Sequence, residues 1–112
     1  MSSAAGFSGL PESFFEYLRE LLVRYPDVES AVLFGSRAKG TWKNGSDVDL
    51  CLRGSSCTLD TLSSVSFALN ETGTFPWKFD VVCSNMIDNA ELLSHIERVG
   101  IQVYARGDVE QV

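Results

Sequence analysis

The sequence predicts a single α+β domain, in which a mixed sheet of three or four strands carries helices packed mainly on one face. The chain has 112 residues, 45% of them hydrophobic, which is enough for one core and too few for two complete domains. Helical and strand periodicities alternate along the chain, and the connection between the first two strands is short. We expect the packed domain to span residues 11–105, between flexible ends at residues 1–10 and 106–112.

The first predicted element is an amphipathic helix that begins at Pro11, a residue suited to the first helical turn. Its apolar face consists of Phe14, Tyr17, Leu18, Leu21, Leu22 and Tyr25. Pro26 ends the helix, because a residue that precedes proline disfavours the helical backbone conformation.

Residues 29–34 and 47–52 form the first two predicted strands. The first is apolar on both faces, which is typical of a central strand. Gly35 closes it, and Gly40 leaves residues 36–39 room for no more than about one helical turn. A parallel crossover needs about a dozen residues or more. We therefore expect an antiparallel pair, with the end of the first strand beside the start of the second.

The second half of the chain contains two more predicted helices and two more predicted strands. Residues 58–70 carry apolar side chains at roughly helical spacing, and residues 78–83 alternate as a strand. Asp88 begins a capping-box pattern that opens a helix, and Gly100 is the expected C′ residue at its end. Residues 101–104 predict a short edge strand.

Charge, apolar run length and cysteine spacing exclude several classes of protein. Nine Lys and Arg residues against fifteen Asp and Glu residues give a formal charge of −6, which disfavours a nucleic-acid substrate. No apolar run approaches the roughly 20 residues needed to cross a bilayer, and the N-terminus lacks a signal-peptide pattern. Cys51, Cys57 and Cys83 fit neither a zinc knuckle nor a disulfide framework. We expect a cytoplasmic protein.

Three aspartates predict a site at one end of the sheet. Asp47 and Asp49 are two residues apart on a strand, so both project from the same face, and Asp80 has the same setting on the third strand. If these strands are neighbours, the carboxylates converge. Two such charges about 4 Å apart repel by about 4 kcal/mol at an effective dielectric near 20. Mg²⁺ would offset this repulsion; the alternative is a solvated acidic face.

Gly35 and Ser36 lie where the antiparallel arrangement brings them to Asp47 and Asp49. Glycine permits close approach of the backbone to a phosphate, and the serine hydroxyl can donate a hydrogen bond. Four of the nine basic residues cluster around this segment: Arg37, Lys39, Lys43 and Arg53. These residues would form a phosphate-binding site next to the metal site. The alternatives are that the Gly-Ser pair is a plain strand-to-helix turn and that the basic residues form a solvated loop.

Two motifs give the chain a recognisable family resemblance. Residues 34–40 (FGSRAKG) and 46–50 (SDVDL), followed by a third aspartate in residues 78–82 (KFDVV), resemble the minimal nucleotidyltransferases, or MNT domains, of the DNA polymerase beta superfamily. The resemblance covers most of the chain, including the final helix, glycine and short strand. It implies the nucleotidyltransferase fold and transfer of a nucleoside monophosphate, commonly AMP from ATP, with two Mg²⁺ ions.

The resemblance also assigns roles to individual residues. Metal-binding and catalytic roles fall to Asp47, Asp49 and Asp80, and Asp80 would also help to deprotonate the acceptor hydroxyl. Contacts to the nucleotide fall to Gly35, Ser36, Arg37, Lys39 and Ser46. Many relatives have arginine where this chain has Lys39, which keeps the charge but loses the two-pronged hydrogen-bonding geometry.

Chains of this size resemble the MNT antitoxin of HEPN/MNT toxin–antitoxin pairs. That resemblance implies a helical HEPN partner that the MNT protein silences by binding and by AMPylation. Two alternatives remain: a binding module that neutralises its partner by occlusion, and the catalytic subunit of a two-subunit enzyme acting on small molecules. A homodimer is compatible with the aromatic residues outside the predicted core.

Five further residues carry separate expectations. Trp42, in a polar loop, either stacks on a base or a partner or packs against its own loop. Trp77 is expected to cover the sheet edge. His95, the single histidine, is expected near the surface, and a catalytic triad within one chain is excluded. Cys83 is expected to fill space in its strand, as is Cys51.

Overall fold

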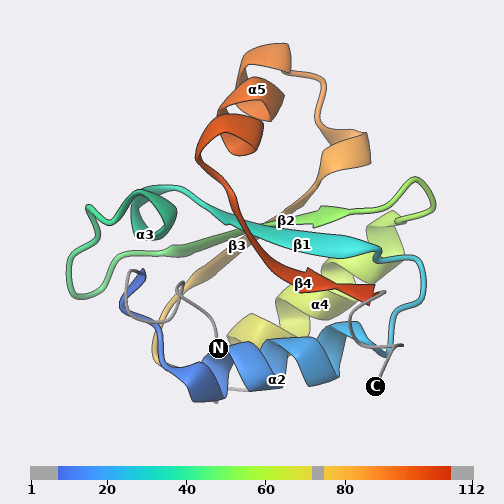
Figure 1. The fold of residues 1–112 in the computed structure, drawn as a ribbon. Helices are drawn as coiled ribbons and strands as arrows, with labels where there is room; N and C mark the ends of the chain where they lie inside the picture. The colour runs from blue at the N-terminus through green and yellow to red at the C-terminus, as the bar shows by residue number, and fades with distance from the viewer. Residues whose placement is uncertain (1–7, 72–74, 107–112) are drawn as a thin grey trace.

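A four-stranded mixed sheet with the strand order β3-β2-β1-β4 forms the centre of the molecule (Figure 1). The structure is a computed structural model and describes residues 8–71 and 75–106. The elements follow one another as α2 (Glu12–Leu22), β1 (Ser30–Phe34), α3 (Ser36–Lys39), β2 (Val48–Arg53), α4 (Leu59–Glu71), β3 (Phe79–Cys83), the 3₁₀ turn η1 (Ser84–Met86), α5 (Ala90–Val99) and β4 (Ile101–Ala105).

The strand pairing follows from the lengths of the connections. β1 pairs antiparallel with β2 through the short α3 connection, which confirms the expected arrangement. β2 pairs parallel with β3, because α4 supplies a crossover long enough to return the chain in the same direction. β4 pairs antiparallel with the other side of β1, so β3 and β4 are the two edges of the sheet.

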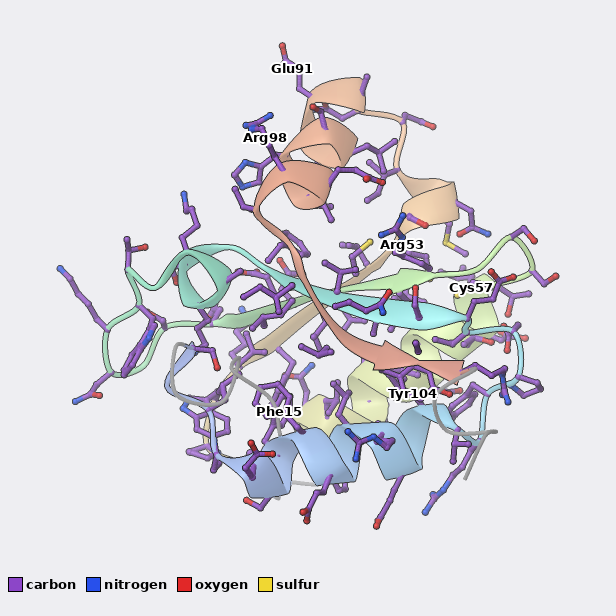
Figure 2. The ribbon with its side chains drawn as sticks, in the orientation of Figure 1. Phe15, Arg53, Cys57, Glu91, Arg98 and Tyr104 are labelled. Atoms are coloured by element: carbon purple, nitrogen blue, oxygen red, sulfur yellow. The ribbon has the colours of Figure 1, made fainter. Side chains whose placement is uncertain are left out.

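One face of the sheet is covered by α2 and α4 and contains the main hydrophobic core. Phe14, Leu18 and Leu22 of α2 are fully buried there, together with Val65 of α4. Figure 2 shows Phe15 rising from α2 toward the sheet. From β2 the core takes alternate residues, Val48, Leu50 and Leu52, as the strand period predicts.

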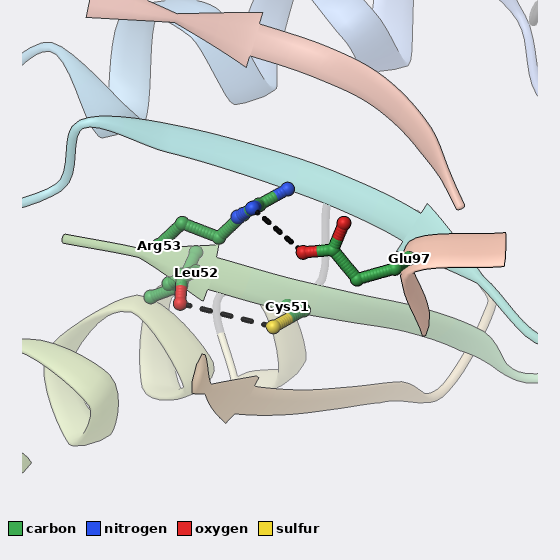
Figure 3. Close-up of polar contacts among 4 residues, drawn as sticks. All are labelled: Cys51, Leu52, Arg53 and Glu97. Atoms are coloured by element: carbon green, nitrogen blue, oxygen red, sulfur yellow. Dashed lines mark hydrogen bonds and ion pairs between the residues drawn. The ribbon is translucent and has the colours of Figure 1, made fainter. Parts of the chain in front are cut away.

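The other face carries α5. Ile96 of this helix packs on Val32 and Cys51 in a smaller apolar cluster. Arg53 at the end of β2 forms an ion pair with Glu97 of α5, with 3.1 Å between Nη2 and Oε2 (Figure 3). Both side chains are exposed, so this pair contributes little to stability. The acidic end of β2, at Asp49, lies outside this apolar cluster.

Two expectations for the ends of α5 need correction. The side chain that caps its N-terminus belongs to Asn89 rather than Asp88: its Oδ1 accepts from the N–H groups of Glu91 and Leu92. Gly100 follows the helix with an extended backbone, φ −70°, and not in the left-handed conformation expected of a C′ glycine. Glycine is needed there because a Cβ would overlap the side chain of Val32.

The packed region extends slightly beyond the residues 11–105 that were expected. Ser8 and Leu10 are buried, and the N–H of Arg106 donates to the carbonyl of Glu29 at 2.9 Å. The remainder of both predicted flexible ends lies outside the described residues. Within the described ranges, no helix is both long enough and apolar enough to span a membrane.

Candidate active site

The three predicted aspartates come from the adjacent strands β2 and β3. Asp49 and Asp80 are register partners in the parallel pairing, and Asp47 lies one residue before β2 begins. By strand alternation, Asp49 and Asp80 face the side of the sheet that carries α5. Asp49 is partly buried, whereas Asp47 and Asp80 are exposed. The predicted placement of these side chains on one face is confirmed for Asp49 and Asp80.

Asp49 has an unusual electrostatic environment. Burial raises the pKa of its carboxyl above the ordinary value, and the negative charges of Asp80 and Asp47 raise this pKa further. Burial disfavours the charged form of an acid, and nearby like charges do the same. A cation or a group that donates hydrogen bonds would therefore be most strongly favoured beside this carboxylate.

Gly35 places the backbone of the β1–α3 turn directly against Asp49. Phe34, the last residue of β1, is the register partner of Asp49. Gly35 has φ 77° and ψ −157°, a conformation that L side chains rarely adopt, and a Cβ there would overlap Oδ2 of Asp49. The expected juxtaposition of residues 35–36 with the carboxylates is therefore present.

The remaining predicted nucleotide contacts surround this turn. Ser36 begins α3 and is partly buried; Lys39 ends α3 and is exposed. Ser46 closes a tight turn, since its N–H donates to the Lys43 carbonyl at 2.9 Å and its hydroxyl accepts from the Lys43 N–H at 2.8 Å. This turn leads directly into Asp47.

The Arg37 side chain, also in α3, is buried. It is 2% exposed, and its guanidinium donates hydrogen bonds to backbone carbonyls and contacts two tryptophan rings. Sequence reasoning missed this, because a basic residue in a Gly-Ser turn has the same pattern whether it faces a phosphate or the core.

The donor set fits a magnesium ion bound together with a nucleotide. Among the described residues, no three His, Cys, Asp or Glu side chains lie close enough together to hold an ion by themselves. Mg²⁺ is usually bound by only one or two protein carboxylates plus substrate phosphates. Asp49 and Asp80 in register, with the Gly35 backbone directly against the Asp49 carboxylate, match that requirement.

The other residues singled out in the sequence have structural settings. Trp42 packs on the N-terminal segment, where a Cβ on Gly9 would overlap its ring. Trp77 stacks with Phe75 at a centroid distance of 5.6 Å. His95 is partly exposed on α5.

Cys51 and Cys83 are not nucleophiles in this setting. Burial raises the pKa of Cys51 to about 11. Burial and a hydrogen bond with Cys57 raise the pKa of Cys83 to about 12; the two sulfur atoms lie 2.8 Å apart. Both thiols are therefore protonated at neutral pH. The contact between Cys57 and Cys83 was not foreseen from their spacing.

Solved structures with the same fold include MNT proteins. One is a mutant of the toxin–antitoxin MntA-HpeT, with a TM-score of 0.68 and 18% identity over 87% of this chain and 78% of that one. Another is tri-AMPylated Shewanella oneidensis HEPN toxin in complex with MNT antitoxin, with a TM-score of 0.57 and 13% identity over 87% and 77%.

A third is a putative nucleotidyltransferase from Sulfolobus solfataricus, with a TM-score of 0.56 and 17% identity over 96% of this chain and 91% of that one. At these identities the likeness shows the fold. A comparison with curated proteins found no significant match.

The model of the polymerase beta nucleotidyltransferase family matches residues 16–108, which is most of the chain. The match includes the Gly35 turn and all three aspartates. The chain therefore belongs to the polymerase beta nucleotidyltransferase family.

Proposed function

We propose that this protein transfers AMP from ATP, with Mg²⁺, to a hydroxyl group on a helical HEPN-type partner, and so acts as an antitoxin. The observation that carries the proposal is the contact between Gly35 and Asp49, with Asp80 in register on the next strand. One short segment thus places a backbone suited to phosphates against carboxylates suited to Mg²⁺.

Each site residue has a role in this reaction. Two Mg²⁺ ions would be held by the three aspartates, Asp47, Asp49 and Asp80. The triphosphate would bind to Gly35 and Ser36. Further contacts to the nucleotide would come from Lys39 and Ser46. Two metal ions at such a site can stabilise the attacking and the leaving oxygen in an in-line displacement. Asp80 is exposed, which suits it to accept the proton of an acceptor hydroxyl.

The proposed partner and location rest on separate observations. Two of the structurally similar proteins are described together with HEPN or HpeT toxins, and a third toxin–antitoxin structure, with a TM-score of 0.65, contains AMP-PNP. The three cysteines are free thiols, which suits a reducing cytoplasm.

The test uses this protein co-purified with the product of the neighbouring gene and incubated with ATP and Mg²⁺. Intact mass spectrometry should show the partner heavier by about 329 Da for each AMP transferred. The shift should disappear in Asp47→Asn and persist in Asp88→Asn, an exposed aspartate before α5. A shift that persists in Asp47→Asn would contradict the assignment. No complex and no shift would point to a small-molecule acceptor.

A second candidate, neutralisation by occlusion, is favoured by the exposed apolar side chains on α4. Leu59 is 66% exposed and Phe67 63%, on the helix that covers the face opposite Asp49 and Asp80. If occlusion suffices, the Asp47→Asn/Asp49→Asn double variant should still neutralise a co-expressed partner. If a folded double variant binds the partner without neutralising it, catalysis is required.

A further inference from the structure

Arg37 is the most buried charged residue among residues 8–71 and 75–106, at 2% exposure. Its Nη1 donates to the carbonyl of Ser8 at 2.9 Å, and its Nε donates to the carbonyl of Ser46 at 3.2 Å. The guanidinium carbon lies 5.2 Å from the ring centroid of Trp42 and 5.5 Å from that of Trp77. We call these five residues the Arg37 cluster.

The cluster joins the segments that lead to the site residues. Arg37 itself follows Ser36 in α3. Ser46 immediately precedes Asp47, and Trp77 lies three residues before Asp80. One side chain therefore contacts all three segments on which the proposed phosphate and metal contacts depend.

The Arg37 guanidinium and the Trp77 ring lie behind the site rather than in it. Trp77 packs edge-on against Phe14 of α2 and against Phe79, which faces the main core. Asp80 follows Phe79 and therefore faces the opposite side of the sheet. A guanidinium that contacts the Trp77 ring on the core side and donates to two backbone carbonyl groups is not placed to contact a nucleotide beside Asp80.

The chemistry of the contacts requires arginine. Hydrogen bonds from a charged donor are roughly twice as strong as neutral ones, and cation–π contacts strengthen when desolvated. The planar guanidinium donates to two carbonyl groups and at the same time contacts two aromatic rings. An ammonium group is a point charge and cannot reproduce that arrangement.

We propose that Arg37 is a positioning residue, which aligns the Gly35–Ser36 turn with Asp47 and Asp80 without touching the nucleotide. This rests on the proposed function for the identity of the aligned groups, and it reverses the role that the family resemblance implies for Arg37.

The first test uses Arg37→Met, with Arg98→Met on α5 as the matched control. Figure 2 shows Arg98 on α5, far from α2. Arg98 is exposed and does not belong to the Arg37 cluster. Trp42 and Trp77 are the only tryptophans, so intrinsic fluorescence reports the cluster directly. We expect a red shift of the emission and about tenfold weaker Mn²⁺ binding, measured by electron paramagnetic resonance, in Arg37→Met alone. Unchanged emission and Mn²⁺ affinity would overturn the proposal.

Kinetics separate positioning from phosphate binding. Misalignment should lower kcat by about tenfold or more and leave the KM for ATP nearly unchanged, because the triphosphate contacts remain. Arg37→Lys should behave like Arg37→Met, since the fork is lost. A raised KM for ATP that Arg37→Lys largely restores would show direct phosphate contact and overturn the proposal.

Two further readouts keep the outcomes distinct. A purely structural role would lower the melting temperature of Arg37→Met while its folded form keeps the wild-type Mn²⁺ affinity; that result also overturns the proposal. If Arg37→Met does not fold, Trp42→Leu, which removes one stacking partner, should weaken Mn²⁺ binding in the same direction, and wild-type affinity there would count against positioning. Absence of nucleotide transfer by the wild-type protein would refute the proposed function. The fluorescence of Arg37→Met would still show whether Arg37 shapes the surroundings of the two tryptophans.

Discussion

Asp49 combines partial burial with two acidic neighbours, and both raise the pKa of its carboxyl. A carboxyl group whose pKa is higher in the folded than in the unfolded state contributes stability below its unfolded pKa. That contribution is lost as the pH rises through the folded-state pKa. At neutral pH without metal, the charged Asp49 therefore lowers the free energy of unfolding.

Replacing Asp49 with asparagine should relieve this cost. We expect Asp49→Asn to have a higher melting temperature than the wild type at pH 7 in the absence of divalent ions. The difference should shrink as the pH falls toward 3, where the wild-type carboxyl is protonated. Thermal unfolding by circular dichroism across this range measures the effect, with Asp88→Asn as the surface control. A difference independent of pH would contradict the electrostatic cause.

Gly35 makes a second prediction at the scale of a single residue. Gly35→Ala adds a methyl group that overlaps Asp49, in a backbone conformation already unfavourable for alanine. Gly45→Ala is the matched control, because Gly45 has φ 86° and open space around its missing Cβ.

We expect Gly45→Ala to cost about 1–2 kcal/mol in the free energy of unfolding, and Gly35→Ala to cost more and to abolish nucleotide transfer. Urea unfolding and the transfer assay measure both. An equal loss in the free energy of unfolding in the two variants would mean that Asp49 moves away from the added methyl group without destabilising the protein.

At the scale of an element, the start of α5 depends on one side chain. Asn89 accepts hydrogen bonds from two N–H groups of the first turn, at 2.9 and 3.1 Å, while Asp88 is the residue favoured by the capping-box pattern. Sequence pattern alone could not separate two adjacent residues that are both good caps; the backbone path from η1 into the helix decides between them.

The two residues can be told apart by substitution. Asn89→Ala should lower the free energy of unfolding by about 1 kcal/mol, because two N–H groups lose their acceptor. Asp88→Ala should change it by less than about 0.5 kcal/mol, as expected for a surface residue outside the cap. Chemical denaturation monitored by circular dichroism measures both. If Asp88→Ala loses more free energy of unfolding than Asn89→Ala, Asp88 is the capping residue, as the capping-box pattern predicts.

At the scale of the whole molecule, metal binding should be linked to folding. A ligand that binds only the folded state raises its stability, by about 2.7 kcal/mol when its concentration is a hundredfold above Kd. In the presence of ATP, we expect Mg²⁺ to raise the melting temperature of the wild type by several degrees and that of Asp49→Asn by much less. Differential scanning fluorimetry at constant ionic strength tests this, since general screening of charge would raise both equally.

The sequence determined the order of the elements, the antiparallel pairing of β1 with β2, and the placement of Asp49 and Asp80 on one face. These features follow from local quantities: the period of apolar residues, the length of a connection and the alternation of a strand. The family, too, could be recognised from a short motif, because only a short loop separates the Gly35 turn from Asp47 and Asp49.

Only the tertiary structure decided which way Arg37 faces and which residue caps α5. Ser8 and Trp77 come from distant parts of the chain and meet Arg37 and the nearby Trp42 only when the segment before α2, the loop after α3 and the segment before β3 are assembled. A basic side chain in a turn can face a phosphate or the interior with equal local propensity. The choice depends on carbonyl groups and aromatic rings that no local pattern contains, and for this reason it appears only in the folded molecule.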